Sequence, residues 1–153
     1  MTPLRARART ACEIARVDPD RFNEWVAAGI YPCAPRTRPG ATRIFDEQDL
    51  ITLCIFRHLT DEGMIPSKAG EMVCELRTLL IERPDAMRVV CLTHSFGGFI
   101  WIDAEHYDPA DDFIPAWGNA RPSVVSAREW RLRFLRQRIA HELAEAAGVV
   151  GED

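Results

Sequence analysis

Long apolar runs are missing from this chain, and so are the signals of a secreted protein. No apolar stretch in the 153 residues reaches the roughly 18 to 20 residues that a membrane span needs. The arginine-rich N-terminus lacks the apolar core of a secretory signal. A hydrophobic content of 47% is nevertheless enough to bury one real core. We therefore expect a compact, soluble, cytoplasmic protein that does not associate with membranes.

Paired cysteine motifs are also missing. The five cysteines lie about twenty residues apart and include no C-x-x-C pair, which argues against a disulfide framework. Cys54 and His58 are one helical turn apart, but a zinc site needs four ligands. We expect Cys54 to be a buried thiol beside a surface or capping histidine, with no metal site and no cofactor.

Lysine is almost absent, since Lys68 is the only lysine among 19 basic residues. The net charge of −4 argues against indiscriminate nucleic-acid binding, but the charge is unevenly distributed. Residues 1–45 carry a net charge of +4, residues 46–120 carry −9, residues 121–138 carry +5 and residues 139–153 carry −4. Basic segments therefore flank an acidic middle. This pattern favours a localised phosphate-binding surface, although genomic base composition can also produce an arginine bias.

Two short helices are predicted near the N-terminus. The sequence Thr-Ala-Cys-Glu at residues 10–13 fits a capping box and starts the first helix. Asp18 and Pro19 start the second, which Gly29 ends. Only residues 16–18 separate the two helices. A short turn before an amphipathic second helix is what a helix-turn-helix needs to present that helix to a major groove.

An arginine-bearing turn region is predicted next. Three prolines and a glycine interrupt residues 32–40, which contain Arg-Thr-Arg at residues 36–38. Together with Arg-Ile-Phe at residues 43–45, they predict an irregular hairpin, or wing, whose guanidinium groups can grip phosphate oxygens. A capping pattern at residues 46–49 begins a third helix, and a fourth begins near Pro66.

In this order, the elements resemble the DNA-binding domain of MerR-type regulators and of related excisionase-like winged helices. The similar stretches are Val17 and Asp18 at the turn, Trp25 in the second helix, Gly-Ile-Tyr-Pro at residues 29–32, and Arg-Ile-Phe-Asp-Glu-Gln-Asp-Leu at residues 43–50. The resemblance covers about half of the chain. It implies that the second helix enters a major groove while the wing contacts neighbouring phosphates.

Carried over by position, the resemblance implies a DNA-binding surface on the second helix and the wing. Its residues are Arg16, Arg21, Asn23, Trp25, Arg36, Thr37, Arg38 and Arg43. Asp20 and Glu24 depart from the family, which commonly places Arg or Tyr toward DNA there. A carboxylate at these positions repels phosphate unless it accepts a hydrogen bond from a cytosine amine. Arg16 has a second interpretation, as a cation at a helix C-terminus.

The residues before the first helix have two interpretations. Arg5, Arg7 and Arg9 alternate with small residues, which is typical of a flexible arm in the minor groove. A disordered, solvated terminus fits the same pattern equally well.

Beyond the fourth helix the resemblance ends. Short apolar runs at residues 87–92 and 99–102 surround a Gly-Gly turn and predict a β-hairpin. A hairpin alone is marginal in water, so it must pack on a helix or on a second protomer. Residues 103–122 predict a long acidic loop. We favour a solvated loop over a binding site for a hard cation, and we expect Phe113 and Trp117 to hold the loop to the core.

The sequence Ser-Ala-Arg-Glu at residues 126–129 is the clearest capping box, and it predicts a helix to about Ala147. The apolar stripe of this helix is Trp130, Phe134, Leu135, Ile139 and Leu143, and its arginines are Arg128, Arg131, Arg133, Arg136 and Arg138. Three interpretations are open: a helix packed on the hairpin with a solvated basic face, a dimer helix such as MerR-like proteins use, or a second phosphate-facing surface.

The sequence thus predicts an α+β, mostly helical fold. A MerR-like winged helix-turn-helix over residues 1–83 is followed by a hairpin, an acidic loop and a long helix over residues 84–153. The predicted function is sequence-specific binding of double-stranded DNA by a homodimeric transcriptional regulator. The alternatives are a phage-type excisionase or small-terminase-like DNA-binding protein, and a protein-interaction adaptor that has lost DNA binding. No P-loop, dinucleotide or G-x-S-x-G motif occurs, so we expect no enzyme activity.

Overall fold

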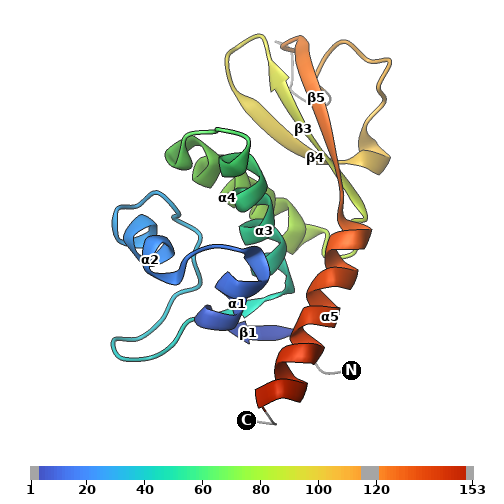
Figure 1. Cartoon of the computed structure of the whole chain (residues 1–153). Helices are drawn as coiled ribbons and strands as arrows, with labels where there is room; N and C mark the ends of the chain where they lie inside the picture. The colour runs from blue at the N-terminus through green and yellow to red at the C-terminus, as the bar shows by residue number, and fades with distance from the viewer. Residues whose placement is uncertain (1–3, 115–120, 151–153) are drawn as a thin grey trace.

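The computed structural model describes residues 4–114 and 121–150, with side chains to residue 147. It is an α+β structure with about half of its residues in helices (Figure 1). The helices are α1 (Ala8–Ala15), α2 (Pro19–Ala27), α3 (Glu47–Asp61), α4 (Pro66–Glu82) and α5 (Leu132–Val150). The strands are β1 (Arg5–Arg7), β2 (Ile44–Asp46), β3 (Arg88–His94), β4 (Phe99–Asp103) and β5 (Val124–Arg131), and a 3-10 turn, η1, spans Ala104–His106. Among the described helices, none has the length and apolar character that crossing a membrane requires.

Helix α3 forms the centre of the main core. Its predicted start is confirmed, because the Asp46 carboxylate accepts from the Asp49 amide at 2.8 Å and Asp49 accepts in return from the Asp46 amide at 3.0 Å. Residues 50–56 are all buried, as expected of a helix that is apolar on every side. Helices α1, α4 and α5 contact it. Buried Asp49 also accepts from Arg77 Nε at 2.6 Å, which fixes α3 to α4.

Strands β4, β3 and β5 form an antiparallel sheet in that order, and the predicted hairpin of β3 and β4 is confirmed. One face packs on α4, where the Trp101 indole donates to the Met72 carbonyl at 2.8 Å. The chain after η1 covers the other face, where Ile114 is fully buried with residues of β3. The prediction that Phe113 holds this loop was wrong, since Phe113 is 46% exposed. The predicted role of Trp117 lies outside the described residues.

Strand β5 replaces the first two turns of the predicted C-terminal helix. It pairs along its length with β3, and Ser126, the predicted helix cap, lies opposite Thr93 with their hydroxyls hydrogen-bonded. Arg128 on β5 makes two hydrogen bonds of 2.7 and 2.6 Å to the Glu62 carboxylate at the end of α3. These long-range contacts outweigh the local capping signal, because strand formation depends mainly on neighbours. The helix itself, α5, begins at Leu132.

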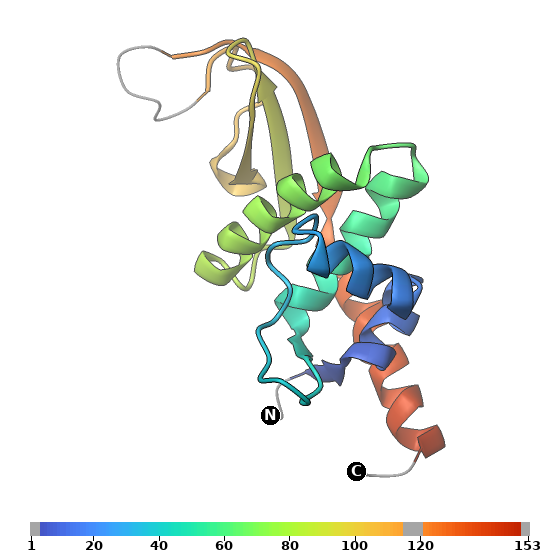
Figure 2. The same ribbon diagram turned by 90° about the vertical axis from the view of Figure 1, so that its left-hand side faces the viewer.

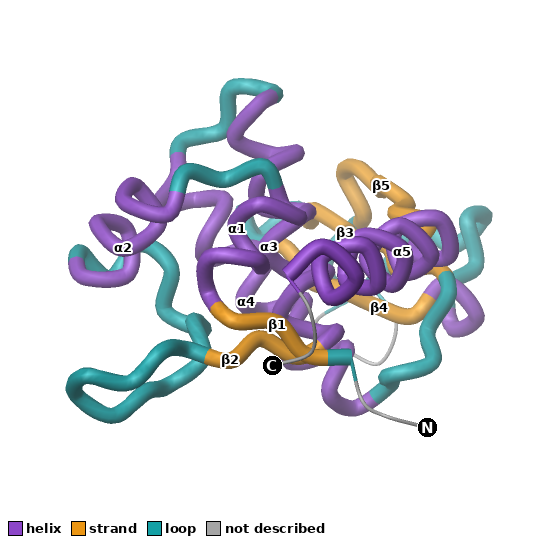
Figure 3. Tube along the Cα trace, turned by 60° about the horizontal axis from the view of Figure 1, so that its bottom comes forward, coloured by secondary structure: helices purple, strands orange, loops and turns teal. Residues whose placement is uncertain are grey.

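Helix α5 packs within its own protomer, against α1 and α3 (Figure 3). Leu132, Leu135 and Ile139 are buried there, whereas Phe134, predicted for the same stripe, is 72% exposed. One continuous core therefore includes residues from both sides of position 83, the predicted domain boundary.

Helix α1 begins at Ala8, before the predicted capping box at residues 10–13. Arg7 is its N-cap in an extended conformation, and no side chain caps the helix. The reason is β1, which pairs with β2 and delivers an extended chain directly to the helix start. The capping-box prediction at this position was wrong.

Candidate nucleic-acid interface

The turn between α1 and α2 is short and firmly held. Arg16 ends α1 in the left-handed conformation with a φ of 62°, and the Val17 amide donates back to the Cys12 carbonyl at 2.8 Å. Val17 is buried, and α2 starts with Pro19 in the first helical position, as predicted, but the predicted capping bond from the Asp18 side chain is not made. The direction of α2 relative to α1 is therefore set by the local chain.

The Arg16 guanidinium is engaged within the protein. It donates to the Glu13 carbonyl at 2.9 Å and to Glu142 Oε1 at 2.7 Å. The first bond places the cation at the C-terminal end of α1, where a positive charge is favourable. The second joins α1 to α5. These contacts favour the interpretation of Arg16 as a cation at a helix C-terminus over its interpretation as a DNA contact.

The outward face of α2 is centred on two acids. Successive residues are about 100° apart around a helix, so Asp20 and Glu24 share the side opposite buried Phe22. Arg21 and Asn23 are exposed on the two flanks of that face. Any partner that approaches α2 head-on therefore meets two carboxylates first, with a cation and an amide to either side.

Trp25 faces inward more than outward. It is half-buried, and its ring meets Phe56 edge-on at a centroid distance of 5.2 Å. The Arg21 guanidinium lies 5.5 Å from the Trp25 ring centroid. Together with Met64 and Ile65, these two residues line an open groove of about 480 Å³ between α2 and the turn before α4. Trp25 thus shapes the side of α2 and does not project from the outward face.

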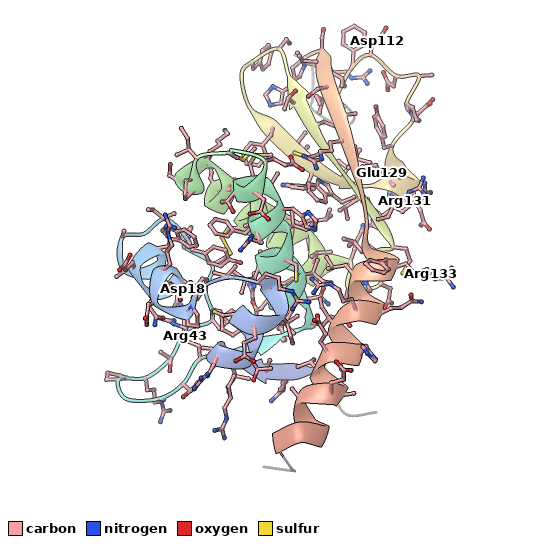
Figure 4. All side chains as sticks on the ribbon, viewed as in Figure 1. Asp18, Arg43, Asp112, Glu129, Arg131 and Arg133 are labelled. Carbon is pink, nitrogen blue, oxygen red and sulfur yellow. A yellow bond between two sulfur atoms is a disulfide. The ribbon has the colours of Figure 1, made fainter. Side chains whose placement is uncertain are left out.

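Residues 28–43 form a loop that projects beside α2, which we call the arginine loop (Figures 1 and 2). Arg36, Thr37 and Arg38 are exposed on it, and the Thr37 hydroxyl donates to the Ala41 carbonyl at 2.9 Å. Arg43 is half-buried and donates to the Pro35 carbonyl, which closes the loop at its base (Figure 4). The residues predicted for the tip are therefore accessible, and Arg43 is a structural contact.

The predicted hairpin within the arginine loop is absent from the described residues. The returning strand, β2, pairs instead with β1, with Arg5 opposite Asp46 and Arg7 opposite Ile44. Ala6 is buried beneath this two-stranded ribbon, while Arg5 and Arg7 are exposed. The interpretation of Arg5 and Arg7 as a flexible or disordered arm was wrong. The alternation of charged and small residues was the signal for a strand.

Strand β1 carries two further arginines at the end of the molecule away from the three-stranded sheet, where it pairs with β2 at the end of the arginine loop (Figures 1 and 3). The exposed arginines of β1 and the loop are Arg5, Arg7, Arg36 and Arg38. Arg9 lies nearby on α1, where its guanidinium is 3.6 Å from Glu13. Sequence reasoning assigned these arginines to two separate features.

The second basic segment is largely neutralised by internal contacts. Arg136 pairs with Glu47, and Arg138 binds Glu142 Oε2 at 2.7 Å. Arg128 is held by two bonds to a carboxylate, as described above, with its guanidinium 4.1 Å from the Trp130 ring centroid. Arg133 points away from the protein (Figure 4). Arg131 is 3.1 Å from the Glu129 carboxylate, but its side chain is 81% exposed, so the phosphate-facing interpretation retains Arg131 and Arg133 of the five named arginines.

The arginine loop is attached to α4 at two points. Cys33 and Cys74 form a disulfide with a Cα separation of 5.4 Å, although the sequence predicted no disulfide framework. The peptide of Ile30 and Tyr31 lies directly on Gly70, where a Cβ would be 3.0 Å from the Ile30 carbonyl carbon and closer still to its oxygen. Position 70 of α4 therefore requires the absence of a side chain.

No protein-family model and no curated protein matches the chain. A functional assignment consequently depends on the surface described above.

Proposed function

We propose that the protein binds double-stranded DNA through the surface made by α2, the arginine loop and β1, as a MerR-like winged-helix regulator. The observation that carries the proposal is that Arg5 and Arg7 lie on β1, which pairs with β2 at the end of the arginine loop that carries Arg36 and Arg38. All four are exposed, and they come from two segments that lie about thirty residues apart in the sequence. Arginine forks bind phosphate oxygens bidentately, so four of them on one side supply affinity and orientation.

In this mode α2 enters the major groove with the acids of its outward face toward the bases. Asp20 and Glu24 repel phosphate, but a carboxylate accepts a hydrogen bond from the N4 amine of cytosine. Arg21 and Asn23 on the flanks have the donors that guanine, adenine or nearby phosphates accept. The arrangement favours a protein whose affinity comes from the loop and the ribbon, and whose specificity requires cytosine beneath α2.

The proposal includes a homodimer on related half-sites. Because α5 buries its apolar stripe against α1 and α3, pairing would use the outer surface of α5, where Phe134 is 72% exposed. Light scattering of the wild type and of Phe134→Ser tests this point, with a dimer expected for the first and a monomer for the second. A monomer in both would remove the dimer from the proposal and leave the DNA surface.

The test of DNA binding is fluorescence anisotropy on random and native upstream duplexes across a salt series. We expect log affinity to fall linearly with log salt, by about 0.9 per neutralised phosphate. Arg36→Glu/Arg38→Glu should lower both the affinity and the slope. Arg43 is left unchanged because it closes the loop. The matched control is Arg83→Glu/Arg133→Glu, which reverses two exposed charges away from the surface.

Two other functions use the same scaffold. An excisionase-like or small-terminase-like protein would bind with the same surface and bend or mark DNA, which a circularly permuted gel-shift assay detects as position-dependent mobility. The acids at the centre of α2 favour the second alternative, an adaptor that binds a protein partner. Absence of binding at low salt by a folded protein would refute the DNA proposal and leave the adaptor.

A further inference from the structure

We propose that the Cys33–Cys74 disulfide is a redox latch that sets the DNA affinity of the arginine loop. The inference rests on the proposed function, because the loop carries Arg36 and Arg38. The disulfide joins positions 41 residues apart and connects the loop to the middle of α4. It is a covalent attachment to α4 three residues before Arg36, the first exposed arginine of the loop.

The structure divides the five cysteines into two classes. Cys12, Cys54 and Cys91 are buried free thiols, and burial is the main cause that raises the pKa of each to about 11. A thiol of this kind is inert at neutral pH, because the thiolate is the reactive species. Cys33 and Cys74 are only half-buried. Redox chemistry under native conditions is therefore directed to this pair.

The position of the disulfide determines what its cleavage releases. Tyr31 stays in place without it, since its buried ring meets Phe22 at 5.2 Å and Phe56 at 5.1 Å. Beyond Cys33, Ala34 is partly buried against the core, and the loop contacts described above are internal to residues 35–43. Breaking the disulfide therefore removes the covalent hold on the segment between Tyr31 and Arg36 while the aromatic core remains intact.

The reaction is a thiol–disulfide exchange with a dithiol. A thiolate of the dithiol attacks Sγ of Cys33, the Sγ–Sγ bond breaks, and Cys74 leaves as a thiolate that takes a proton. The second thiol of the reductant then displaces Cys33, so that two cysteine thiols and an oxidised dithiol result. The Cys33 amide donates to Cys74 Sγ at 3.2 Å, which favours Cys74 as the leaving thiolate. Hydrogen peroxide reverses the change, oxidising the two thiols to the disulfide with formation of two waters.

Reduction should weaken DNA binding because a freed loop must be ordered again on the DNA. We expect an affinity about tenfold lower, the loss that corresponds to ordering roughly one further backbone residue. The loop should also become a better protease substrate. Trypsin can cleave after Arg36, whereas Arg38 precedes a proline and is protected. We expect cleavage at Arg36 to accelerate about tenfold on reduction, since proteolysis follows the open population.

The experiment compares the wild-type protein before and after dithiothreitol, with removal of the reductant and hydrogen peroxide as the return step. Iodoacetamide labelling with mass spectrometry should show no modified cysteine before reduction and modification of Cys33 and Cys74 after it. Anisotropy on one duplex and trypsin cleavage are measured on the same samples. The control is Cys33→Ser/Cys74→Ser, which should resemble the reduced wild type and ignore dithiothreitol. The wild-type comparison decides the matter even if this variant does not fold.

The outcomes separate the two proposals. DNA binding that is unchanged by reduction overturns the latch and leaves the proposed function standing. Absence of DNA binding in both states overturns the latch as a regulator together with the proposed function, and the trypsin measurement then reports the loop alone. Binding that weakens on reduction and recovers with peroxide, only when both cysteines are present, supports the latch.

Discussion

Replacing Gly70 by alanine should destabilise the protein, although alanine is the better helix former. At an ordinary interior helix position this change stabilises by about 0.8–1.0 kcal/mol. Here the new methyl group would overlap the Ile30 carbonyl, whose carbon alone lies only 3.0 Å from the Cβ position. Relief of the overlap moves a peptide on the order of 1.5 Å to reach normal contact. The steric effect and the helix propensity therefore oppose each other.

The magnitudes decide in favour of the steric effect. Overpacking of this kind costs about 1–3 kcal/mol. A shift of Ile30 also displaces Tyr31 from two ring contacts, each with a contribution of about 0.5–1.5 kcal/mol. After subtraction of the gain in helix propensity, we expect Gly70→Ala to lower the free energy of unfolding by about 1–5 kcal/mol.

Urea unfolding followed by tryptophan fluorescence measures this loss, as a lower midpoint with an unchanged m-value. The matched control is Glu75, an exposed position of the same helix. The difference in free energy of unfolding between Glu75→Ala and Glu75→Gly measures the gain in helix propensity at a site where the added methyl group meets no steric overlap. If Gly70→Ala stabilised the protein by as much as Glu75→Ala is more stable than Glu75→Gly, the arginine loop would not lie as close to α4 as described.

Three further results are expected. Asp20→Asn/Glu24→Gln should raise affinity for random duplexes severalfold and reduce preference for a selected site, measured by anisotropy; unchanged affinity on both would show that α2 does not face DNA. The hydrogen bond from Arg128 lowers the pKa of Glu62 below its ordinary value of 4.5, so the wild type should have a higher urea midpoint than Glu62→Gln at pH values above 4.5. The difference between the two midpoints should shrink as the pH falls through the lowered pKa, and a difference that does not depend on pH would contradict this. Ile114→Ala should cost about 2–5 kcal/mol in thermal or urea unfolding, and a loss below 1 kcal/mol would show that the acidic loop does not seal the sheet.

Elements with strong local signals could be predicted from the sequence. The start of α2 at Pro19, its end before Gly29 with a φ of 74°, and the capping box of Asp46 and Asp49 are all confirmed, whereas the predicted cap by Asp18 is not. Each depends on hydrogen bonds or backbone angles within a few residues. The chain therefore specifies them before any tertiary contact forms.

Elements that depend on distant partners could not be predicted in the same way. Ser126 belongs to a good capping sequence, yet β3 is available as a strand partner and the pairing decides the conformation. The disulfide of Cys33 and Cys74 leaves no spacing signal, because its two positions meet only when the arginine loop lies on α4. Local patterns do not contain this information.

The candidate surface shows the same division. Exposure of Arg36 and Arg38 followed from the prolines and glycine around them. The bond of Arg16 to the Glu13 carbonyl matches the helix C-terminus interpretation, because the two residues are only three positions apart. The bonds of Arg16 to Glu142 and of Arg43 to the Pro35 carbonyl could not be predicted, because the fold brings these acceptors near. Residue type predicted which side chains are able to bind phosphate, and packing determined which remain available for it.

The junction of β5 and α5 has a mechanical consequence. The strand passes into the helix between Arg131 and Leu132, and the Leu132 amide donates to the Met87 carbonyl at 2.8 Å beside the pair of Arg88 and Arg131. No linker residue separates the two elements. If the sheet tilts, α5 would move with it as a rigid body and shift α1, which α5 contacts. The shift of α1 would then move the turn from which α2 projects (Figure 2).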